Sequence, residues 1–349
     1  MIIYRNLFNK IIQPETLFLA WKKFRQGKGS KLDVLLFESE LESNIFKLSR
    51  ELKSKKYKHA GYTGFYISDP KLRHIHKATA RDRVLHHSIA SVLTPVFEPT
   101  FISNSFSCRV GKGSHRGVEV LRKMLRKESE NNTKRCYVLK CDIRKFFDSI
   151  DHKTLLSILR RKIRDVDTLW LLENIIDSYP GGASDLFNRR GVPIGNLTSQ
   201  LFANIYMNEF DQFIKHKLGV CYYARYTDDF VIVSKDKEYL KKLIIPVETF
   251  LRNVLSLELH PNKVEILDYT KGVDYLGNII FPNHSLIRRR TKKRIIRKFE
   301  GKIKEYRRGE ISKEKINATL SSYLGVLSHM NAYKLSMRLK NYFWLWVNE

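Results

Sequence analysis

Two adjacent aspartates between two β-prone runs place the strongest constraint on how this chain folds. Asp228 and Asp229 stand in a short polar segment between the runs VCYYARY and FVIVS. Two such runs around a polar turn predict an antiparallel hairpin with both carboxylates at its tip. Like-charge repulsion makes this pair costly unless a cation or another partner offsets it. For an isolated pair, a turn that favours aspartate is the more common explanation.

A third aspartate ends a separate predicted strand. Asp142 closes the run CYVLKCDI, and adjacent strands of one sheet would bring it beside the hairpin tip. Three carboxylates would then hold two hard cations, with Mg²⁺ as the expected ion and Mn²⁺ as an alternative. Two ions about 4 Å apart activate a 3′-hydroxyl and stabilise a leaving pyrophosphate. The three acids together therefore predict phosphoryl transfer.

The charge balance predicts a polyanionic partner. Lys and Arg number 64 against 36 Asp and Glu, which leaves a net charge of +28. Such an excess concentrates nucleic acid and releases its counterions on binding. From residue 286 to residue 349 there are 17 basic residues against 5 acidic ones. A solvated basic face explains one such run better than it explains the total.

Other features exclude several classes of protein. With 43% hydrophobic and 12% aromatic residues, the chain has enough apolar surface to fold. Its four cysteines form no C-x-x-C pair, which argues against a zinc ribbon or a disulfide framework and fits a reducing cytoplasm. No membrane-length apolar span appears, so no membrane partner is expected. His74, His76, His86 and His87 lack cysteine partners at finger spacing, which favours polar or RNA-facing roles over a metal.

The periodicity of apolar residues predicts an α+β fold. Leu41, Ile45, Leu48 and Leu52 recur at helical spacing within a mostly helical region of residues 1–60. Residues 61–75 predict a hairpin that turns at Pro70. Further helices are predicted at residues 81–96, 117–127, 198–218 and 246–255, after an N-cap at Asp151, and from residue 291 onward. Strands and helices that alternate around a hairpin indicate α+β.

Three ordered motifs resemble the reverse transcriptase family over most of the chain. They are DIRKFFD at residues 142–148, GVPIGNLTSQ at residues 191–200 and YTDD at residues 226–229. The resemblance implies a right-hand polymerase fold with fingers, a palm built on an antiparallel sheet with the catalytic hairpin, and a helical thumb. It divides the chain into a helical N-terminal extension (1–60), fingers and palm (61–285) and a basic thumb (286–349).

The same resemblance assigns roles to individual residues. Asp142 and Asp228 would bind both metal ions, Asp229 would support them, and the backbone oxygen of Ile143 would complete one coordination sphere. Phe147 resembles the steric gate that rejects a 2′-hydroxyl, although a lone Phe is more often a core residue. The remaining implied residues are the triphosphate clamp Arg73 with Lys71, the nucleotide-site residues Ile194, Gly195 and Gln200, the proton donor Lys263, and the primer grip Tyr275, Leu276 and Gly277. Taken singly, the basic residues would be assigned to a solvated surface.

Two departures from the commoner motif indicate a subfamily. Ile194 and Gln200 stand where Gln and Pro are more usual, as in the reverse transcriptases of diversity-generating retroelements. Those enzymes copy a template RNA with frequent errors at adenines, and the cDNA then diversifies a target gene by mutagenic retrohoming. The resemblance implies dNTPs, template RNA, an RNA/DNA hybrid and an oligomeric helical accessory protein (the accessory variability determinant, Avd) as partners.

Two kinds of alternative stay open at this point. A group II intron-like, retron-like or phage-defence reverse transcriptase would share the chemistry but differ in template and purpose. Ile194 and Gln200 argue against retrons. The chain ends shortly after the expected thumb, which leaves no room for maturase and endonuclease modules and indicates a minimal element. An alternative of another class is a non-catalytic, basic RNA-binding scaffold, which the intact acids disfavour.

Overall fold

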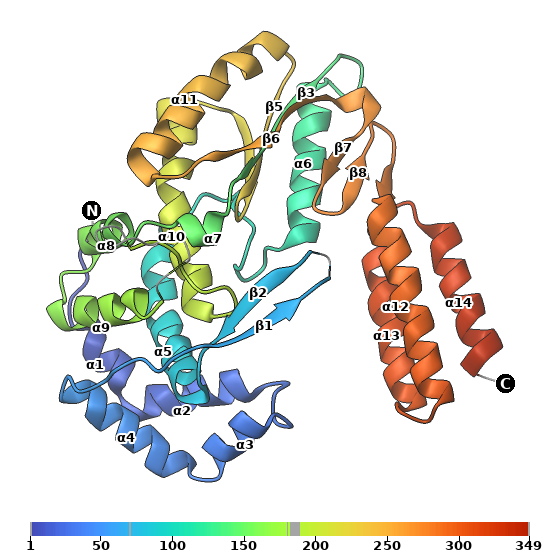
Figure 1. Ribbon diagram of the computed structural model, residues 1–349. Helices are drawn as coiled ribbons and strands as arrows, with labels where there is room; N and C mark the ends of the chain where they lie inside the picture. The colour runs from blue at the N-terminus through green and yellow to red at the C-terminus, as the bar shows by residue number, and fades with distance from the viewer. Residues whose placement is uncertain (1, 70, 180, 182–188, 348–349) are drawn as a thin grey trace.

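The computed structural model describes residues 2–69, 71–179, 181 and 189–347. Its N-terminal region is helical, as predicted for residues 1–60, and Ile45, Leu48 and Leu52 are buried on one face of the fourth helix. These helices pack around a long fifth helix (Figure 1). Their bounds are α1 Leu7–Ile12, α2 Pro14–Arg25, α3 Leu32–Glu38, α4 Leu41–Lys53 and α5 Ala80–Phe97.

A two-stranded antiparallel sheet projects from this helical region, as Figure 1 shows. It consists of β1 (Thr63–Ile67) and β2 (Arg73–Lys77), which confirms the predicted hairpin and extends its second strand by two residues. The predicted turn at Pro70 lies outside the described residues. The tip of the hairpin reaches the C-terminal helices, where Asp69 pairs with Lys298 at 2.6 Å.

A four-stranded antiparallel sheet forms the centre of the molecule. Its strand order is β4-β5-β3-β6, so β3 lies between the hairpin β4–β5 and the long strand β6. The strands are β3 Tyr137–Ile143, β4 Tyr222–Tyr226, β5 Asp229–Ser234 and β6 Leu259–Asp268. The predicted acidic hairpin and its neighbouring strand are therefore confirmed, and their register pairs Asp142 with Asp229.

Helices cover this sheet and join it to the N-terminal region through one continuous apolar core. Asp151 caps α8 by accepting a hydrogen bond from the Thr154 backbone at 2.8 Å, as predicted. The helices are α6 Ser114–Glu128, α7 Phe146–Ser149, α8 His152–Lys162, α9 Val166–Asp177, α10 Leu197–Gln212 and α11 Lys237–Leu255. A short π-helical segment, Phe213–Lys217, extends α10.

The predicted start of one helix was wrong. The sequence prediction begins this helix at residue 246, whereas α11 begins at Lys237. Asp236 caps it by accepting hydrogen bonds from two backbone N–H groups. Leu243 and Val247 are both buried, so the apolar stripe continues past Pro246. Burial of this stripe outweighs the hydrogen bond that the proline removes.

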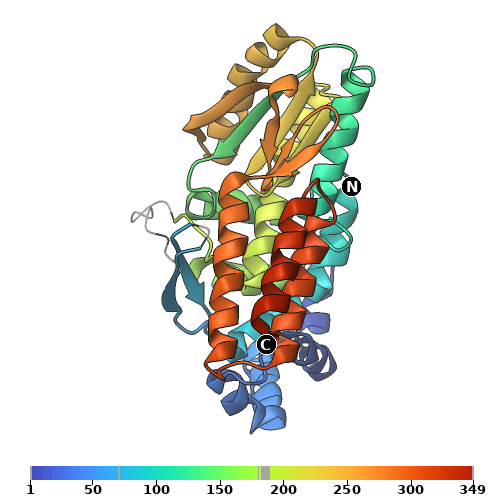
Figure 2. The same ribbon diagram turned by 90° about the vertical axis from the view of Figure 1, so that its right-hand side faces the viewer.

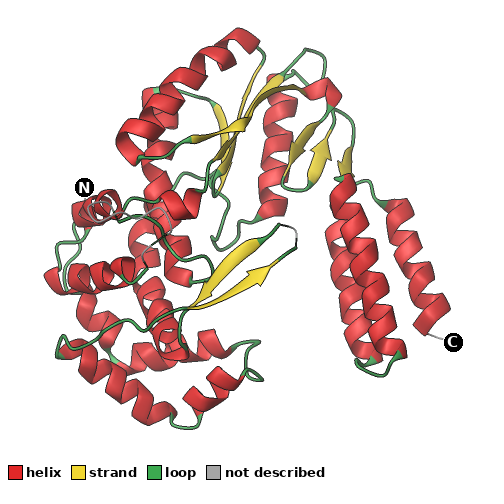
Figure 3. Cartoon of the chain, viewed as in Figure 1, coloured by secondary structure: helices red, strands yellow, loops and turns green. Residues whose placement is uncertain are grey.

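The C-terminal region confirms the predicted basic helical tail. A small sheet leads into three helices that lie side by side (Figure 2) and share an apolar core of their own. The elements are β7 Val273–Tyr275, β8 Asn278–Ile280, β9 Ser285–Ile287, α12 Arg289–Arg307, α13 Lys313–Leu327 and α14 Tyr333–Val347. Figure 3 shows the resulting mixture of helices and antiparallel sheets, which confirms the α+β class. Within the described part of the chain, every helix falls short of the length and apolarity that a membrane crossing requires.

Candidate active site

The three aspartates meet where β3 and β5 lie side by side. Asp142 is paired in register with Asp229, the first residue of β5. The turn before it places Thr227 in the left-handed region at φ 59°. Ile143 donates its backbone N–H to the Asp228 carbonyl at 3.2 Å, which ties the turn to β3. The structure therefore brings all four residues that the sequence predicts as metal ligands to one end of the sheet.

The electrostatics of this tip are unfavourable without a cation. Burial raises the pKa of Asp228, and the charge of Asp142 raises it further. Burial also raises the pKa of Asp229 to about 7, against the opposing charge of Lys140. The Oδ1 atom of Asp229 is buried and has no hydrogen-bond partner among the residues that the structure describes. Hard carboxylate oxygens in such a cluster are the donors that Mg²⁺ prefers.

A lysine forms an ion pair with one of these carboxylates. Lys263, on β6, donates from Nζ to Asp142 Oδ1 at 2.9 Å, so the predicted proton donor lies at the tip. Among the described residues, no three His, Cys, Asp or Glu side chains already converge as a metal shell. A divalent ion that binds here must therefore compete with the Lys263 ammonium and draw the carboxylates together.

A buried ion pair that the sequence analysis missed stabilises the turn between β4 and β5. Arg225 contacts Asp211 in bidentate fashion, at 2.7 Å from Nε and 2.6 Å from Nη2. Its Nη1 also donates to the Thr227 carbonyl at 3.0 Å. The side chains of Arg225 and Asp211 are 1% and 0% exposed. An arginine in the middle of the apolar run VCYYARY was the available signal, because a buried charge requires a partner.

A basic cleft of about 1260 Å³ opens beside Asp229. Lys71 and Arg73 of the hairpin line it, together with Asp229 and residues of α12. The charge of Arg73 also lowers the pKa of Asp228, although burial outweighs it. The cations of the C-terminal side are Arg288, Arg289, Arg290, Lys293, Arg294 and Arg297. The two predicted clamp residues therefore line the same cleft as Asp229.

The segment with the unusual motif packs against the hairpin. Ile194 accepts a hydrogen bond at its carbonyl from the His76 backbone, at 3.0 Å. Gly195 has φ 117°, and a Cβ there would lie 2.8 Å from the Ile75 side chain. Only glycine fits both the conformation and this close approach. Gln200 lies half-buried in the first turn of α10.

Phe147 stands on the short helix that follows β3. It is half-buried, and its carbonyl accepts a hydrogen bond from the Val192 backbone at 2.8 Å. The ring lies in an edge contact with Phe146, with centroids 5.3 Å apart. The structure therefore joins the first and second sequence motifs near the aspartates.

The predicted primer-grip residues form the turn between β7 and β8. Leu276 and Gly277 have φ values of 48° and 88°, and both line the basic cleft. Tyr275 differs from them, because its side chain is fully buried in the core and its hydroxyl lacks a hydrogen-bond partner in the described part of the chain. Backbone and Leu276 atoms, not the tyrosine ring, therefore face the cleft.

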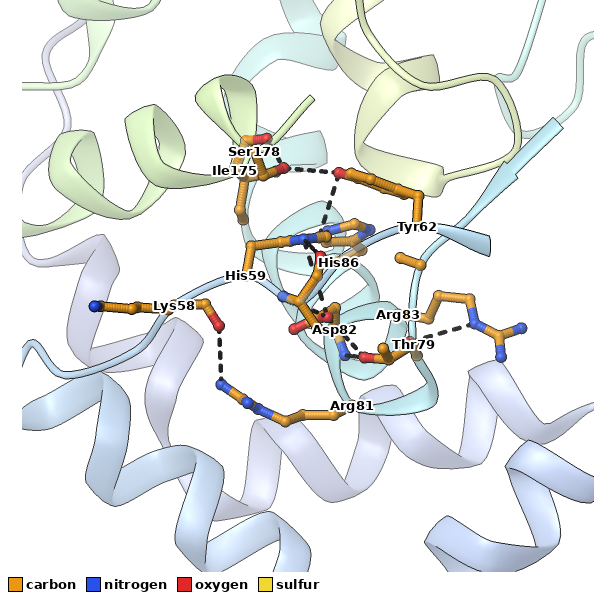
Figure 4. Close-up of polar contacts among 12 residues, drawn as sticks. Lys58, His59, Tyr62, Thr79, Arg81, Asp82, Arg83, His86, Ile175 and Ser178 are labelled. Carbon is orange, nitrogen blue, oxygen red and sulfur yellow. Dashed lines mark hydrogen bonds and ion pairs between the residues drawn. The ribbon is translucent and has the colours of Figure 1, made fainter. Parts of the chain in front are cut away.

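A second buried polar network lies beneath the hairpin (Figure 4). Asp82 is fully buried and accepts hydrogen bonds from the Thr79 hydroxyl at 2.6 Å and from Tyr57 at 2.8 Å. His59 and His86 face each other, with their Nε2 atoms 3.2 Å apart. Burial lowers the pKa of both histidines, well below the ordinary value for His86. Both therefore stay neutral at physiological pH.

These histidines predict acid sensitivity. Burial, with the charges of Lys28 and Lys23, lowers the pKa of the neighbouring His87 to about 4. A lowered folded-state pKa means that the unfolded chain takes up protons first, so stability is full above about pH 6.5 and falls toward pH 4. We expect the native chain to lose more thermal stability between pH 7 and pH 5 than His87→Gln does. The measurement is the thermal unfolding midpoint at each pH, monitored by circular dichroism. Equal decreases in the midpoint for both chains would show that His87 is not the cause of the acid sensitivity.

The chain is similar to known proteins over most of its length. A family model described as reverse transcriptase (RNA-dependent DNA polymerase) matches residues 58–280. Protein YkfC of Escherichia coli (strain K12) is 26% identical over 332 residues, which cover 82% of this chain and 84% of that protein. The group II intron-encoded protein LtrA of Lactococcus lactis subsp. cremoris is 22% identical over 79% of this chain. The chain covers 56% of LtrA, just over half of its length.

Proposed function

The chain belongs to the reverse transcriptase family, the RNA-dependent DNA polymerases, and from this premise we propose that Asp142, Asp228 and Asp229 form its nucleotidyl-transfer centre. One observation carries this assignment: the sheet register that sets Asp142 directly beside Asp229. Family membership implies template RNA and dNTPs as substrates. Primer extension on a defined RNA with Mg²⁺ and dNTPs tests the proposal, and failure to produce cDNA would overturn it.

The donor set supports two Mg²⁺ ions, with Mn²⁺ as an alternative. Asp142 and Asp228 would hold the ions, with Asp229 and the backbone oxygen of Ile143 in support. When bound, the ions would activate the primer 3′-hydroxyl and stabilise the leaving pyrophosphate. Lys263 lies within hydrogen-bond reach of Asp142, so its ammonium would donate a proton to the departing pyrophosphate.

The arrangement around the cleft supports a right-hand polymerase. In this proposal the hairpin β1–β2 belongs to the fingers, the four-stranded sheet is the palm, and α12–α14 form the thumb, with domain divisions at residues 60 and 285. Arg73, aided by Lys71, would clamp the triphosphate through its planar charged fork. Phe147 would exclude a 2′-hydroxyl, and the turn at Leu276 would hold the primer. Cations of α12 would contact the hybrid backbone without reading its sequence.

Ile194 and Gln200 support a finer assignment to a diversity-generating retroelement. A glutamine in place of Ile194 would hydrogen-bond near the nascent base pair, whereas isoleucine supplies only shape. A site without polar contacts cannot penalise a mispair through lost hydrogen bonds, so discrimination loosens. The cDNA would then carry errors opposite template adenines. A small helical accessory protein similar to Avd belongs to the same proposal, and its co-purification with the chain would test it.

We expect Ile194→Gln to lower misincorporation opposite template adenines. The contact between the Ile194 carbonyl and the His76 backbone does not involve the side chain, so the substitution should leave the segment in place. The measurement is sequencing of cDNA made from one RNA by both chains. Ile194→Leu is the matched control and should keep the native error spectrum. An unchanged spectrum in Ile194→Gln would count against the assignment.

The similarity to LtrA favours a second candidate, a group II intron-like reverse transcriptase. Such an enzyme would show no concentration of errors at adenines. Neighbouring genes offer another distinction, because a template repeat paired with a variable repeat supports diversification. Retron-like and phage-defence roles would share the chemistry of the aspartates. A non-catalytic scaffold is disfavoured by family membership and by the intact acids.

A further inference from the structure

The two faces of the hairpin β1–β2 present different chemistry. Side chains alternate between faces along a strand, so Arg73 and Ile75 share one face and His74 lies on the other. The first face meets the cleft and Gly195. On the opposite face, His74 is the cross-strand partner of Tyr66. The hairpin is a two-stranded sheet, so no further described strand pairs with either edge.

Tyr66 and His74 form a flat aromatic platform on that outer face. Their rings are stacked, with centroids 4.5 Å apart and planes at 15°. His74 lies over Gly64, where a Cβ would approach His74 Nε2 to 2.5 Å. The absence of a side chain at Gly64 therefore leaves room for the imidazole ring to pack against the strand. Tyr66 is 67% exposed, so this pair offers a ring face to solvent.

The column of rings continues from the platform toward the protein. His74 makes an edge contact with His76 at 4.2 Å, and His76 contacts Tyr179 at 4.7 Å. The Tyr179 hydroxyl and His76 Nδ1 are 3.2 Å apart, which fixes the inner end of the column. The platform is thus held from behind while its outer ring stays exposed.

The chemistry of the platform favours an unpaired nucleobase over an apolar protein partner. Its rings carry polar atoms, and residues 61–77 contain three lysines or arginines against one aspartate. Nucleobases stack on exposed aromatic rings without regard to sequence, beside cations that follow the backbone. Bases in a duplex are already stacked, so the fitting ligand is single-stranded RNA.

We propose that Tyr66 and His74 form a stacking site for a base of the uncopied, single-stranded template. The inference rests on the proposed function. Arg73 and His74 are adjacent on β2, but their side chains lie on opposite faces of the hairpin. A template RNA that leaves the cleft and passes around the hairpin would therefore reach the platform within a short distance. Its role is to hold the template ahead of the copying position, and it takes no part in the chemistry.

Binding measurements test the site without polymerisation. The probe is an RNA/DNA hybrid with a five-nucleotide 5′ RNA overhang, compared with the same hybrid made blunt, in EDTA and at fixed salt. We expect Tyr66→Ala to weaken binding of the overhang probe about tenfold, and to leave the blunt probe unchanged. Tyr66→Phe keeps the ring and should bind as the native chain does. Tyr239→Ala, which removes a partly exposed tyrosine on α11, is the surface control.

Two further arms separate stacking from other causes. An overhang of abasic residues should bind native protein and Tyr66→Ala equally, because it offers no base to stack. Gly64→Ala should weaken the overhang probe alone, since the added Cβ displaces the His74 ring. Equal losses on blunt and overhang probes, or full affinity in Tyr66→Ala, would overturn the site. Because cDNA synthesis is not the readout, failure here is distinct from failure of the polymerase assignment.

Discussion

Asp228→Asn is expected to reduce cDNA synthesis by at least about a thousandfold. Metal ions supply several kcal/mol of charge stabilisation in phosphoryl transfer, and each 1.4 kcal/mol corresponds to about a tenfold change in rate. A neutral amide removes the charge that attracts the ions but keeps the shape of the side chain. The measurement is single-turnover primer extension with Mg²⁺ and dNTPs. Activity within tenfold of the native chain would refute the catalytic assignment.

The same substitution should leave the fold intact or make it more stable. Burial and the charge of Asp142 raise the pKa of Asp228, so its ionised form is disfavoured in the folded chain. A raised acid pKa costs stability as pH rises above the unfolded value, and asparagine removes this cost at neutral pH. Thermal unfolding without divalent ions should therefore show an equal or higher midpoint. A lower midpoint together with lost activity would indicate a structural role.

A matched control tests whether any lost carboxylate has this effect. Asp236 caps α11 and is remote from the tip along β5. Asparagine is about as good an N-cap as aspartate, so Asp236→Asn should keep native activity and stability. An equal loss of cDNA in both variants would show that the effect of Asp228→Asn is not specific to the tip.

Arg225→Met is expected to cost about 3–5 kcal/mol of unfolding free energy, the largest stability effect anticipated for a single change. Removal of one partner from a buried pair leaves an uncompensated charge. Asp211 would keep the Tyr223 hydroxyl, which donates to it at 2.7 Å, but would lose the neutralising charge of the guanidinium. The Thr227 carbonyl would lose its donor as well, so cDNA synthesis should also fall. Urea unfolding with circular dichroism measures the first effect.

An exposed ion pair provides the comparison. Arg144 and Glu258 lie 3.4 Å apart, with side chains 56% and 64% exposed. Surface pairs contribute about 0–1 kcal/mol, so Arg144→Met should shift the urea midpoint little. Similar losses of unfolding free energy for Arg144→Met and Arg225→Met would contradict the conclusion that burial makes the Arg225–Asp211 pair the more important for stability.

Local patterns were sufficient to predict most elements of the fold. Helical spacing located α4, and the alternation of polar and apolar runs located both hairpins, because each signal depends on neighbours in sequence. The prediction was wrong at the start of α11, which lies at Lys237 and not at residue 246. Packing of Leu243 and Val247 against the sheet decided that boundary, and packing is not a local property.

The candidate site divides in the same way. The three aspartates, Lys71 and Arg73 were predicted from motifs, because the resemblance to the family locates these side chains by their order along the chain. Burial of the Tyr275 ring could not be predicted from the sequence. The local sequence of the turn does not show whether the ring points into the core or into the cleft, because that depends on the packing of other elements. The ion-pair partner of Arg225 could not be predicted either. Asp211 lies on α10 and Arg225 on β4, and only the tertiary structure brings the two together.

The sequence alone therefore determined the acidic hairpin, the basic charge and the order of the motifs, all of which are properties of a linear chain. Tertiary structure alone decided that Asp142 pairs with Asp229, that Lys263 bonds to Asp142, and that Tyr66 stacks on His74. Strand register and the face on which each side chain lies set these contacts, and two of the three join residues on strands that are far apart in the sequence. A slip of one residue would have turned each side chain to the opposite face.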